Sequence, residues 1–424
     1  MVAETIKPGY KQTEIGIIPE DWDVVELNSI AQISSGGTPF RGNLNFWNGK
    51  IPWITTTLID FNVITEAFEF ITEKGLRNSA TKLYTKGTIL MAMYGQGKTR
   101  GKVAVLGIDA TVNQACAAID LQKNIDSNYI FMNLSNRYNE IRNLSNTGNQ
   151  ENLNIGLIKG VLVPVPKIKE EQSAIAQALS DTDELIQRLD KLITKKKDIK
   201  KGAMQELLTG KKRLPGFSGE WEEEELGVIG EISGAGVDKK NIPGETPVRL
   251  VNFLDVYHRD FIRSNMLNHW VTAPTHKVVK CSVKKGDIFF TPSSEMREDI
   301  GLSAVAMEDI PDATYSYHVT RFRLFEEWDI KFSTYVFNGR TFLNQCETVC
   351  EGSGKRYVIN MGKFRGLKIK YPKEKKEQEA IGNILFSMDS EIEQLEAKRD
   401  KYNEIKQGMM QQLLTGRIRL KCKK

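Results

Sequence analysis

Two long stretches of the sequence carry apolar residues at heptad spacing. Their seam positions follow one another in alternating steps of four and three residues, from position 175 to 193, where Thr182 occupies one step, and again from 381 to 395. This spacing is typical of a coiled coil, in which one narrow apolar face packs against a partner helix. We expect the seam to consist of Ile175, Leu179, Ile186, Leu189 and Ile193 in the first stretch and Ile381, Leu385, Met388, Ile392 and Leu395 in the second.

The two stretches are copies of one another. They align without a gap when Gln172 is matched with Gln378, and both end in the tetrapeptide Leu-Leu-Thr-Gly, at Gly210 and Gly416. Glycine is favoured just beyond the end of a helix. Each copy predicts a helix of about 39 residues, which is roughly 58 Å long, and the obvious partner of each helix is the other copy. If the two halves of the chain are related by a two-fold axis, the two helices run antiparallel.

Each copy closes one half of the chain, and each half opens with a second repeated segment. Trp22 and Trp221 mark these opening segments, and acidic residues and a leucine follow both tryptophans. Between the opening segment and the long helix, the two halves share one order of expected elements. These are a strand (88–93 or 287–291), a charged loop, a strand (102–106 or 302–306), a helix (near 129–143 or 332–345), a loop, and a last strand (160–165 or 366–371).

This order predicts an α+β protein. We expect two mixed α/β domains joined by two long coiled-coil helices, which run antiparallel if the internal repeat follows a pseudo-two-fold axis. The resemblance described below implies the same antiparallel pair. Because the two frames agree while their loops differ, binding is expected to reside in the loops. The expected boundaries are residues 1–168 for the first domain, 169–210 for the first long helix, 211–375 for the second domain, and 376–424 for the second long helix and tail.

Composition and charge narrow the class of protein only a little. The length of 424 residues suits two or three domains with sizeable cores. A net charge of +5 permits nucleic-acid binding without requiring it. The five cysteines are scattered, which favours reduced thiols and gives no metal-ligand pattern. No signal peptide or apolar run of membrane-spanning length is apparent, so we expect a cytoplasmic protein without a membrane partner.

One motif resembles a catalytic one. Residues 92–99 approach the phosphate-binding P-loop pattern, but Ala92 replaces its first glycine, and a strand pattern rather than a helix follows. We therefore expect a Gly-rich hairpin, and a nucleotide hydrolase that uses Lys98 is the weaker interpretation. The four histidines all lie in the second half, and no Pro-Pro dipeptide is present, so the amino-methyltransferase box is absent. We expect a non-catalytic chain that binds no cofactor and no metal.

The loops carry residues suited to DNA. Arg and Lys can bridge guanine O6 and N7, Asn and Gln can bridge adenine N6 and N7, and most protein–DNA hydrogen bonds go to the backbone. Asn154 and Asn360 occupy matching positions and are expected to shape their loops. The lysines at 195–197, 200 and 201 are expected to form a solvated helix face, with a DNA-facing side as the alternative. The candidate DNA contacts are Thr38, Arg41, Lys98, Arg100, Gln150 and Asn152 in the first domain and Lys239, Lys240, Arg297, Lys355, Arg356 and Tyr357 in the second.

The chain resembles the specificity (S) subunits of type I restriction–modification systems. The resemblance rests on the opening segment from Ile15 to Trp22, the two helix starts around Gln172 and Gln378, and the doubled Leu-Leu-Thr-Gly tetrapeptide. The residues before Trp221 depart from the first opening segment. The resemblance implies two target-recognition domains, each reading one half of a bipartite site in double-stranded DNA, and a helix pair that serves as the spacer between them.

The resemblance also implies partners. Two modification (methyltransferase) subunits would dock on the chain, followed by two restriction (motor-nuclease) subunits. Adenine N6 methylation from S-adenosylmethionine would be carried out by these partners, which would also hold ATP and Mg. On the residues alone, a coiled-coil adaptor that binds only protein, without DNA readout, is the alternative.

Overall fold

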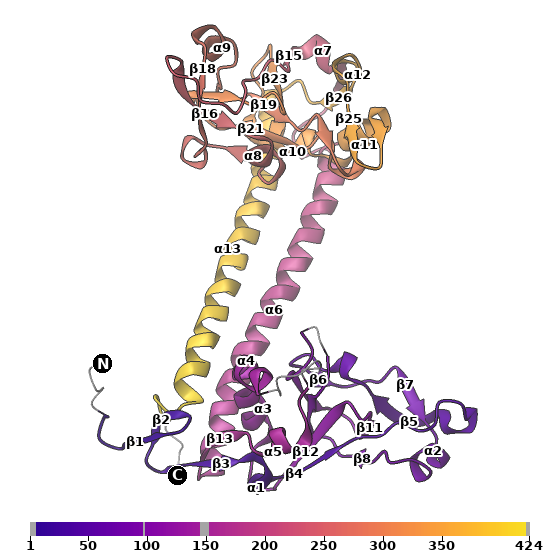
Figure 1. Ribbon diagram of the computed structural model, residues 1–424. Helices are drawn as coiled ribbons and strands as arrows, with labels where there is room; N and C mark the ends of the chain where they lie inside the picture. Colours follow the sequence, from indigo (N-terminus) through magenta and orange to yellow (C-terminus); the bar gives the residue numbers. More distant parts are fainter. Residues whose placement is uncertain (1–5, 96–97, 145–151, 421–424) are drawn as a thin grey trace. The chain divides into compact units, whose positions relative to one another are not determined.

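The computed structural model describes residues 6–95, 98–144 and 152–420 (Figure 1). By its contacts the chain forms two compact units. One contains the residues up to 188 and those from 398 onward, and the other contains residues 189–397. Each unit therefore holds one globular domain together with one part of each long helix. The linear boundaries expected from the sequence stay a prediction, because the units group residues by contact rather than by order along the chain.

The globular domain of the first unit is built on two sheets. Its strands are β1 (Tyr10–Thr13), β2 (Gly16–Pro19), β3 (Trp22–Glu26), β4 (Ala31–Ser35), β5 (Trp47–Ile54), β6 (Val63–Ile64), β7 (Glu69–Ile71), β8 (Leu83–Tyr84), β9 (Ile89–Ala92), β10 (Val103–Leu106), β11 (Ala110–Val112), β12 (Cys116–Leu121) and β13 (Leu162–Pro166). Its helices are α1 (Leu27–Ile30), α2 (Glu73–Arg77), α3 (Ser127–Asn136), α4 (Tyr138–Asn143) and α5 (Ile155–Lys159), with 3-10 turns η1 (Leu44–Phe46) and η2 (Thr56–Leu58). In the described residues the sheet orders are β4-β12-β9-β10-β6 and β7-β5-β11-β8, while β1 pairs with β2 and β3 with β13.

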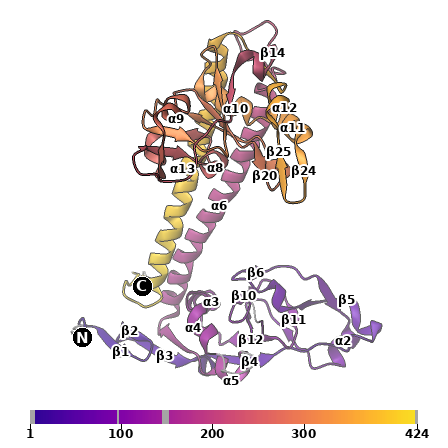
Figure 2. The same ribbon diagram turned by 45° about the horizontal axis from the view of Figure 1, so that its top comes forward.

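The globular domain of the second unit repeats this plan (Figure 2). Its strands are β14 (Glu222–Glu225), β15 (Gly230–Ser233), β16 (Thr246–Val251), β17 (Phe261–Ile262), β18 (Trp270–Ala273), β19 (Ile288–Phe290), β20 (Ser293–Ser294), β21 (Ser303–Ala306), β22 (Ala313–Tyr315), β23 (Thr320–Leu324), β24 (Glu351–Ser353), β25 (Arg356–Val358) and β26 (Lys368–Tyr371). Its helices are α7 (Leu226–Ile229), α8 (Phe253–Tyr257), α9 (Thr275–Lys280), α10 (Ile330–Phe337), α11 (Arg340–Val349) and α12 (Met361–Arg365), with 3-10 turns η3 (Ser264–Met266) and η4 (Arg297–Asp299). Its main sheet, β15-β23-β19-β21-β17, matches the order β4-β12-β9-β10-β6 strand for strand.

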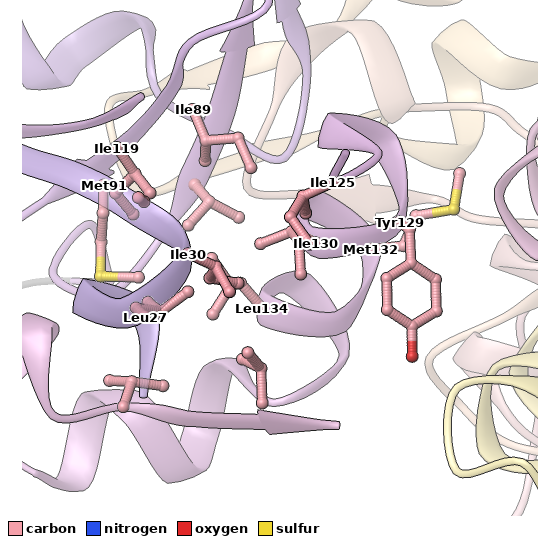
Figure 3. Close-up of a cluster of buried hydrophobic side chains, with 14 of the residues drawn as sticks. Leu27, Ile30, Ile89, Met91, Ile119, Ile125, Tyr129, Ile130, Met132 and Leu134 are labelled. Atoms are coloured by element: carbon pink, nitrogen blue, oxygen red, sulfur yellow. The ribbon is translucent and has the colours of Figure 1, made fainter. Parts of the chain in front are cut away.

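The central strands are apolar along their whole length because both faces of the main sheet are buried. In β9, Ile89 and Met91 belong to one core, which α1 and α3 complete (Figure 3), whereas Leu90 and Ala92 belong to a second core on the opposite face. Successive side chains of a strand point to opposite faces, so a strand that is covered twice needs an unbroken apolar run. The expected strands are confirmed, and β9 and β10 form the expected antiparallel hairpin.

The expected helices between sheet and long helix are each divided in two. In the first domain α3 and α4 meet at Arg137, whose backbone leaves the helical region at φ −99° and ψ 20°. In the second domain α10 ends at Phe337 and α11 begins at Arg340, after Gly339 in an extended conformation. The sequence pattern, which carries apolar residues across these breaks, predicted a single helix in each place.

The two long helices, α6 (Lys169–Leu207) and α13 (Lys375–Leu413), lie side by side and antiparallel within each unit (Figure 1). Eight of the ten expected seam residues are buried, and Met388 and Leu395 are half-buried. The seam is not a coiled coil throughout, however. Ile175 and Leu179 join the core of the first domain and Ile381 and Leu385 that of the second, because each domain covers its own apolar surface with the start of a long helix.

Charged side chains pair across the helices in both units. In the second unit Lys196 lies 2.7 Å from Glu391, and Lys200 lies 2.5 Å from Asp389. In the first unit Lys406 pairs with Asp183. The partners advance in opposite directions along the two helices, as an antiparallel pair requires. The lysines at 196, 197 and 200 are therefore largely engaged by carboxylates of α13, which disfavours a role in facing DNA.

Equivalent clamps attach each domain to the start of a long helix. The amide oxygen of Gln172 accepts a hydrogen bond from the backbone N–H of Asp126 (2.8 Å), and its amide nitrogen donates to the carbonyl of Pro166 (2.9 Å). Gln378 makes the matching bonds, from the N–H of Asp329 (3.0 Å) and to the carbonyl of Pro372 (2.9 Å). The two glutamines that match in the sequence repeat therefore make the same pair of hydrogen bonds in the structure.

A second clamp ties the end of the opposite long helix to the same place. In the first unit Arg419 donates to Glu171 (2.7 Å) and to Asp21 (2.8 Å), and these contacts hold the pKa of Asp21 below its usual range. In the second unit Arg213 holds Glu377 with two bonds of 2.6 and 2.7 Å. Each domain is therefore fastened both to the beginning of one long helix and to the end of the other.

Candidate nucleic-acid interface

In each domain the loops at one edge of the main sheet are tied together by backbone hydrogen bonds. The N–H of Gly37 donates to Val112 (2.9 Å), and the N–H of Leu153 donates to Met93 (3.0 Å). In the second domain the N–H of Ile359 makes the matching bond to Pro292 (2.9 Å). We call each set a loop face. The first loop face comprises residues 36–43, 93–95, 98–101, 113–115 and 152–154, and the second comprises residues 234–241, 291–302, 316–319 and 351–360.

One asparagine in each domain, Asn154 or Asn360, lies where the loop meets the following helix. The side chain of Asn154 accepts a hydrogen bond from the N–H of Leu157 (2.9 Å), and that of Asn360 accepts one from Lys363 (2.9 Å). Each asparagine is therefore the N-cap of the helix that follows, α5 or α12. This confirms the expectation that the two residues shape their loops.

Most candidate residues of the first domain lie on the first loop face. The hydroxyl of Thr38 donates to the side-chain oxygen of Gln114, on the neighbouring loop. Lys98 is exposed, and its backbone carbonyl accepts a bond from the Tyr138 hydroxyl (2.6 Å). Asn152 is half-buried. Gln150 lies outside the described residues.

The two arginines of the first domain differ from the expectation. Arg100 is buried, with 3% of its surface exposed, so it does not reach outward to a polyanion as the sequence suggested. The packing around the β9–β10 hairpin encloses it, which the hairpin pattern alone could not reveal. Arg41 is half-exposed but engaged: it pairs with Glu69 and lies over the ring of Trp47, 3.9 Å from its centroid. Glu69 raises the pKa of Arg41, and Arg41 lowers that of Glu69.

The candidate residues of the second domain converge more closely. Lys355 and Arg356 lie on the hairpin of β24 and β25, and β20 adds a strand beside it (Figure 2). The guanidinium of Arg297 lies over the ring of Tyr357, 5.4 Å from its centroid. A cavity of about 540 Å³ opens beside the hairpin. Its lining residues are Phe253, Tyr257, Ser293, Ser294, Glu295, Met296, Asp299, His318, Lys355 and Arg356.

Among the described residues, no carboxylate forms an ion pair with the candidate cations of the second loop face. Within the part of the chain that the structure describes, Lys239, Lys240, Arg297, Lys355 and Arg356 form no ion pair. Other arginines of the same domain are paired, since Arg249 binds Asp312 and Arg323 binds Asp287. Two of these cations, Lys355 and Arg356, line the cavity. Cations without a carboxylate partner beside a cavity favour an anionic ligand, and DNA phosphates are such ligands.

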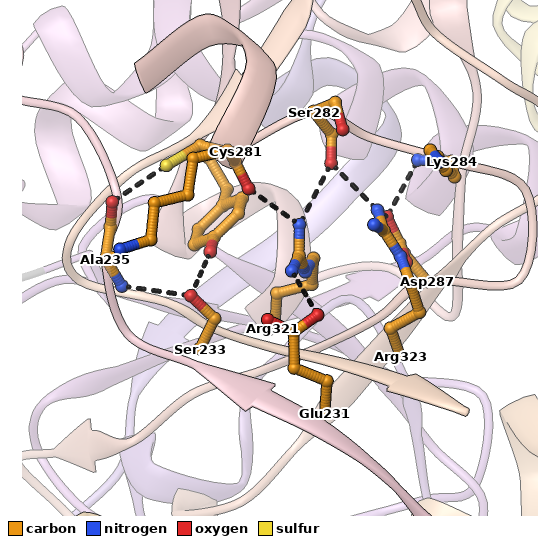
Figure 4. A network of polar contacts seen from close by, with 11 residues as sticks. Glu231, Ser233, Ala235, Cys281, Ser282, Lys284, Asp287, Arg321 and Arg323 are labelled. Carbon is orange, nitrogen blue, oxygen red and sulfur yellow. Dashed lines mark hydrogen bonds and ion pairs between the residues drawn. The ribbon is translucent and has the colours of Figure 1, made fainter. Parts of the chain in front are cut away.

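A buried polar network holds the loop that carries Lys239 and Lys240 (Figure 4). The hydroxyl of Tyr315 donates to Ser233 (2.8 Å), and the thiol of Cys281 donates to the carbonyl of Ala235 (2.8 Å), where the loop begins. Beside them the buried Arg321 donates to Glu231 (3.1 Å) and to the carbonyl of Lys280 (3.1 Å). The network fixes the start of the loop, so the two lysines project from a defined anchor.

Sequence reasoning missed two residues of the second loop face, Tyr317 and His318. Their rings lie 4.0 Å apart, and His318 lines the cavity. Burial and the nearby charges of Lys239 and Arg356 lower the pKa of His318. A single histidine in a polar loop gives no periodic signal in the sequence. Its neighbours, Lys239 and Arg356, come from other loops and are known only from the folded structure.

Other kinds of site find little support. No group of three or more His, Cys, Asp or Glu side chains is placed to hold a metal ion in the described ranges. In the same ranges no helix has the length and apolar character needed to cross a membrane. The segment with the P-loop likeness leads into β10 rather than a helix, so it offers no helix N-terminus to a phosphate.

Comparisons with known proteins agree with this arrangement. The family model described as type I restriction modification DNA specificity domain matches residues 19–200 and again residues 218–407. The type I restriction enzyme MjaIX specificity subunit of Methanocaldococcus jannaschii is 30% identical over 187 residues, which is 43% of this chain and 42% of that protein. The MjaVIII specificity subunit of the same organism is 24% identical over 428 residues, which is 95% of this chain and 94% of that protein.

A solved structure shares the fold. The crystal structure of the type I restriction–modification S subunit from M. genitalium superposes with a TM-score of 0.54 at 16% identity. The match covers 92% of this chain and 96% of that one. The match therefore spans most of both chains.

Proposed function

This chain belongs to the type I restriction modification DNA specificity family, and from that premise we propose that each globular domain reads one half of a bipartite DNA site. The observation that carries the proposal is the presence of two loop faces on one repeated frame. The frames share their sheet order and their capping asparagines. The loop faces differ in nearly all their side chains, so the two half-sites should differ in sequence.

The proposed contacts follow from exposure and charge. In the first domain they are Thr38, Lys98 and Asn152, with Gln150 beside them in sequence and Arg41 held against Trp47. In the second domain they are Lys239, Lys240, Arg297, Lys355, Arg356 and Tyr357. The buried Arg100 is left out of this set. Most of these contacts would go to phosphates and set the position of the domain on the duplex, and fewer would read base edges.

The chain itself would be non-catalytic and would act within a complex. We propose that two modification subunits and two restriction subunits assemble on it, and that S-adenosylmethionine, ATP and Mg are bound by those partners. The paired long helices would carry the modification subunits and set the gap between half-sites. The alternative of an adaptor that binds only protein gains no support from a family match to a DNA specificity domain.

A domain exchange tests the proposal. Residues 29–155 are replaced by the equivalent stretch of another specificity subunit, and the chain is expressed with its modification subunit. Long-read mapping of methylated adenines should show one altered half-site and one unchanged half-site. The reciprocal exchange of the second domain should alter only the other half. A change of both half-sites in either exchange would contradict modular readout. Absence of salt-dependent binding of the mapped duplex by the assembled complex would favour the adaptor that binds only protein.

A further inference from the structure

The second loop face contains a histidine, and the residues that define the first loop face include none. All four histidines of the chain lie in the second domain, and only His318 lies on a loop face. The turn that carries it is the same in both domains. The side chain of Asn113 accepts from the N–H of Ala115 (3.1 Å), and that of Ser316 accepts from the N–H of His318 (3.3 Å). An imidazole thus occupies the place that a methyl group occupies in the first domain.

Several cations lie near His318 or line the cavity beside it. Lys239 and Arg356 lie close enough to act on its charge, and Lys355 lines the same cavity. The hydroxyls of Ser293 and Ser294 lie along the neighbouring strand, and Arg356 donates to Ser293 over 3.5 Å. The cavity is thus lined by two cations, two serine hydroxyls and the His318 imidazole, and such donors and positive charges suit a phosphate oxygen.

Two acidic residues, Glu295 and Asp299, also line this cavity, and one of them already accepts a hydrogen bond from the protein. Asp299 accepts a hydrogen bond from the Tyr257 hydroxyl (2.7 Å), at the α8 wall. Glu295 is exposed beside it. Against these two carboxylates stand Lys239, Lys355 and Arg356, none of which is paired with a carboxylate in the described residues. The balance of charge around His318 is therefore positive before any ligand arrives.

We propose that His318 contacts a DNA backbone phosphate in the cavity of the second loop face and takes up a proton as that phosphate binds. The inference rests on the proposed function and adds a regulation of one half-site. Binding of the half-site read by the second domain would be coupled to pH, whereas binding of the other half-site would involve no histidine of this chain.

The direction of the coupling follows from the charges. In the free protein, burial and the two neighbouring cations disfavour the imidazolium, so the pKa of His318 lies below its usual value of 6.5. A phosphate placed among these cations favours the imidazolium and raises the pKa. Binding then strengthens as pH falls through the pKa of the complex and stops strengthening below the pKa of the free protein. One coupled proton changes the dissociation constant by at most about tenfold per pH unit.

The test uses the full chain assembled with its modification subunits and the duplex identified by methylation mapping. Dissociation constants are measured between pH 5.5 and 8 at constant ionic strength for the wild type, His318→Gln and His276→Gln. His276 is exposed on α9, outside the residues that make up the second loop face, and is the matched control. We expect the ratio of the His318→Gln to the wild-type dissociation constant to grow by about three- to tenfold between pH 8 and pH 6, while His276→Gln follows the wild type throughout.

Calorimetry in two buffers of different ionisation enthalpy then counts the protons taken up near pH 7. The wild type should take up a larger fraction of a proton than His318→Gln, and His318→Asn serves as a second variant if the first folds poorly. A ratio of the two dissociation constants that is the same at pH 8 and at pH 6 would overturn the inference. Absence of specific binding by the wild type at every pH would instead count against the proposed function.

Discussion

In each domain one buried glutamine side chain, Gln172 or Gln378, joins the domain to the start of a long helix. Gln378 has both ends of its side chain engaged by backbone groups, one on the loop before α10 and one on the residue after β26. Only an amide supplies an acceptor and a donor at this length, since Glu would lack the donor and Leu would lack both. The same geometry at Gln172 explains why this position repeats in the sequence.

Replacing Gln378 with alanine should leave the N–H of Asp329 and the carbonyl of Pro372 buried without partners. We expect a loss of about 2–4 kcal/mol in the free energy of unfolding of the second unit, because each unsatisfied buried group costs about 1–3 kcal/mol. Chemical denaturation of the full chain, followed by tryptophan fluorescence, measures the loss. Gln411→Ala is the control, since Gln411 is exposed on α13, and it should change stability by less than about 0.5 kcal/mol. Equal effects of the two changes would show that the clamp contributes nothing.

Arg356 tests the phosphate contacts of the second loop face. Arg356→Ala should raise the dissociation constant of the assembled complex by about three- to tenfold for matched and mismatched duplexes alike, because a phosphate contact carries no sequence information. The slope of log affinity against log salt should become shallower by about 0.9. Arg340→Ala is the control, since Arg340 is paired with Glu347 on α11. An unchanged salt slope for Arg356→Ala would remove this residue from the interface.

At the scale of single residues, the sequence revealed roles that depend on local structure and missed those that depend on assembly. The loop-shaping role of Asn154 and Asn360 could be predicted because the two residues occupy matching positions in the repeat, and the capping bond behind it is a local contact. The burial of Arg100 and the pairing of Arg41 with Glu69 could not, because both result from chain segments that pack from a distance. His318 was missed for the same reason.

At the scale of elements, the charges of α6 and α13 are arranged so that only one orientation suits them. In the second unit the basic part of α6 lies beside the acidic part of α13, with Lys196 on Glu391 and Lys197 on Glu396. A parallel pair would place like charges together. The apolar seam would hold the helices together in either direction. The ion pairs therefore select the antiparallel orientation and add little to the free energy of unfolding.

Charge reversal measures that contribution. Lys196→Glu with Lys197→Glu should lower the free energy of unfolding by about 0.5–2 kcal/mol, a modest loss because these pairs are largely exposed. Adding Glu391→Lys and Glu396→Lys should recover most of the loss, and the effect should shrink at high salt. Lys195→Glu is the control on the same helix. Failure of the fourfold variant to recover stability would show that the lysines act individually rather than as partners of α13.

The elements that the sequence predicted well are those with a period. The heptad steps predicted α6 and α13, and the unbroken apolar runs predicted the doubly covered strands such as β9 and β19. The divisions between α3 and α4 and between α10 and α11 were missed, because apolar residues continue across the breaks. The packing of Ile175 and Ile381 in the domain cores was missed. A heptad position indicates that a residue is buried, but it does not indicate which part of the chain buries it.

At the scale of the whole molecule, the doubled clamps lead to a prediction about spacing. Each domain is fastened to the start of one long helix and the end of the other. Lengthening both helices by the same amount should therefore preserve every clamp. We expect that seven residues inserted after Ile193 and seven after Arg399 move the preferred gap between half-sites while both half-sites stay the same.

The size of the change follows from helix geometry. One heptad adds about 10.5 Å to a helix, which corresponds to roughly three base pairs at 3.4 Å each, and it returns the seam to nearly the same face. Insertion in α6 alone would shift the seam and the ion pairs out of register with α13, so this variant should lose methylation rather than change the gap. Mapping of methylated adenines distinguishes these outcomes. An unchanged gap in the doubly lengthened chain would mean that the modification subunits or the DNA, and not the helix pair, set the distance between the half-sites.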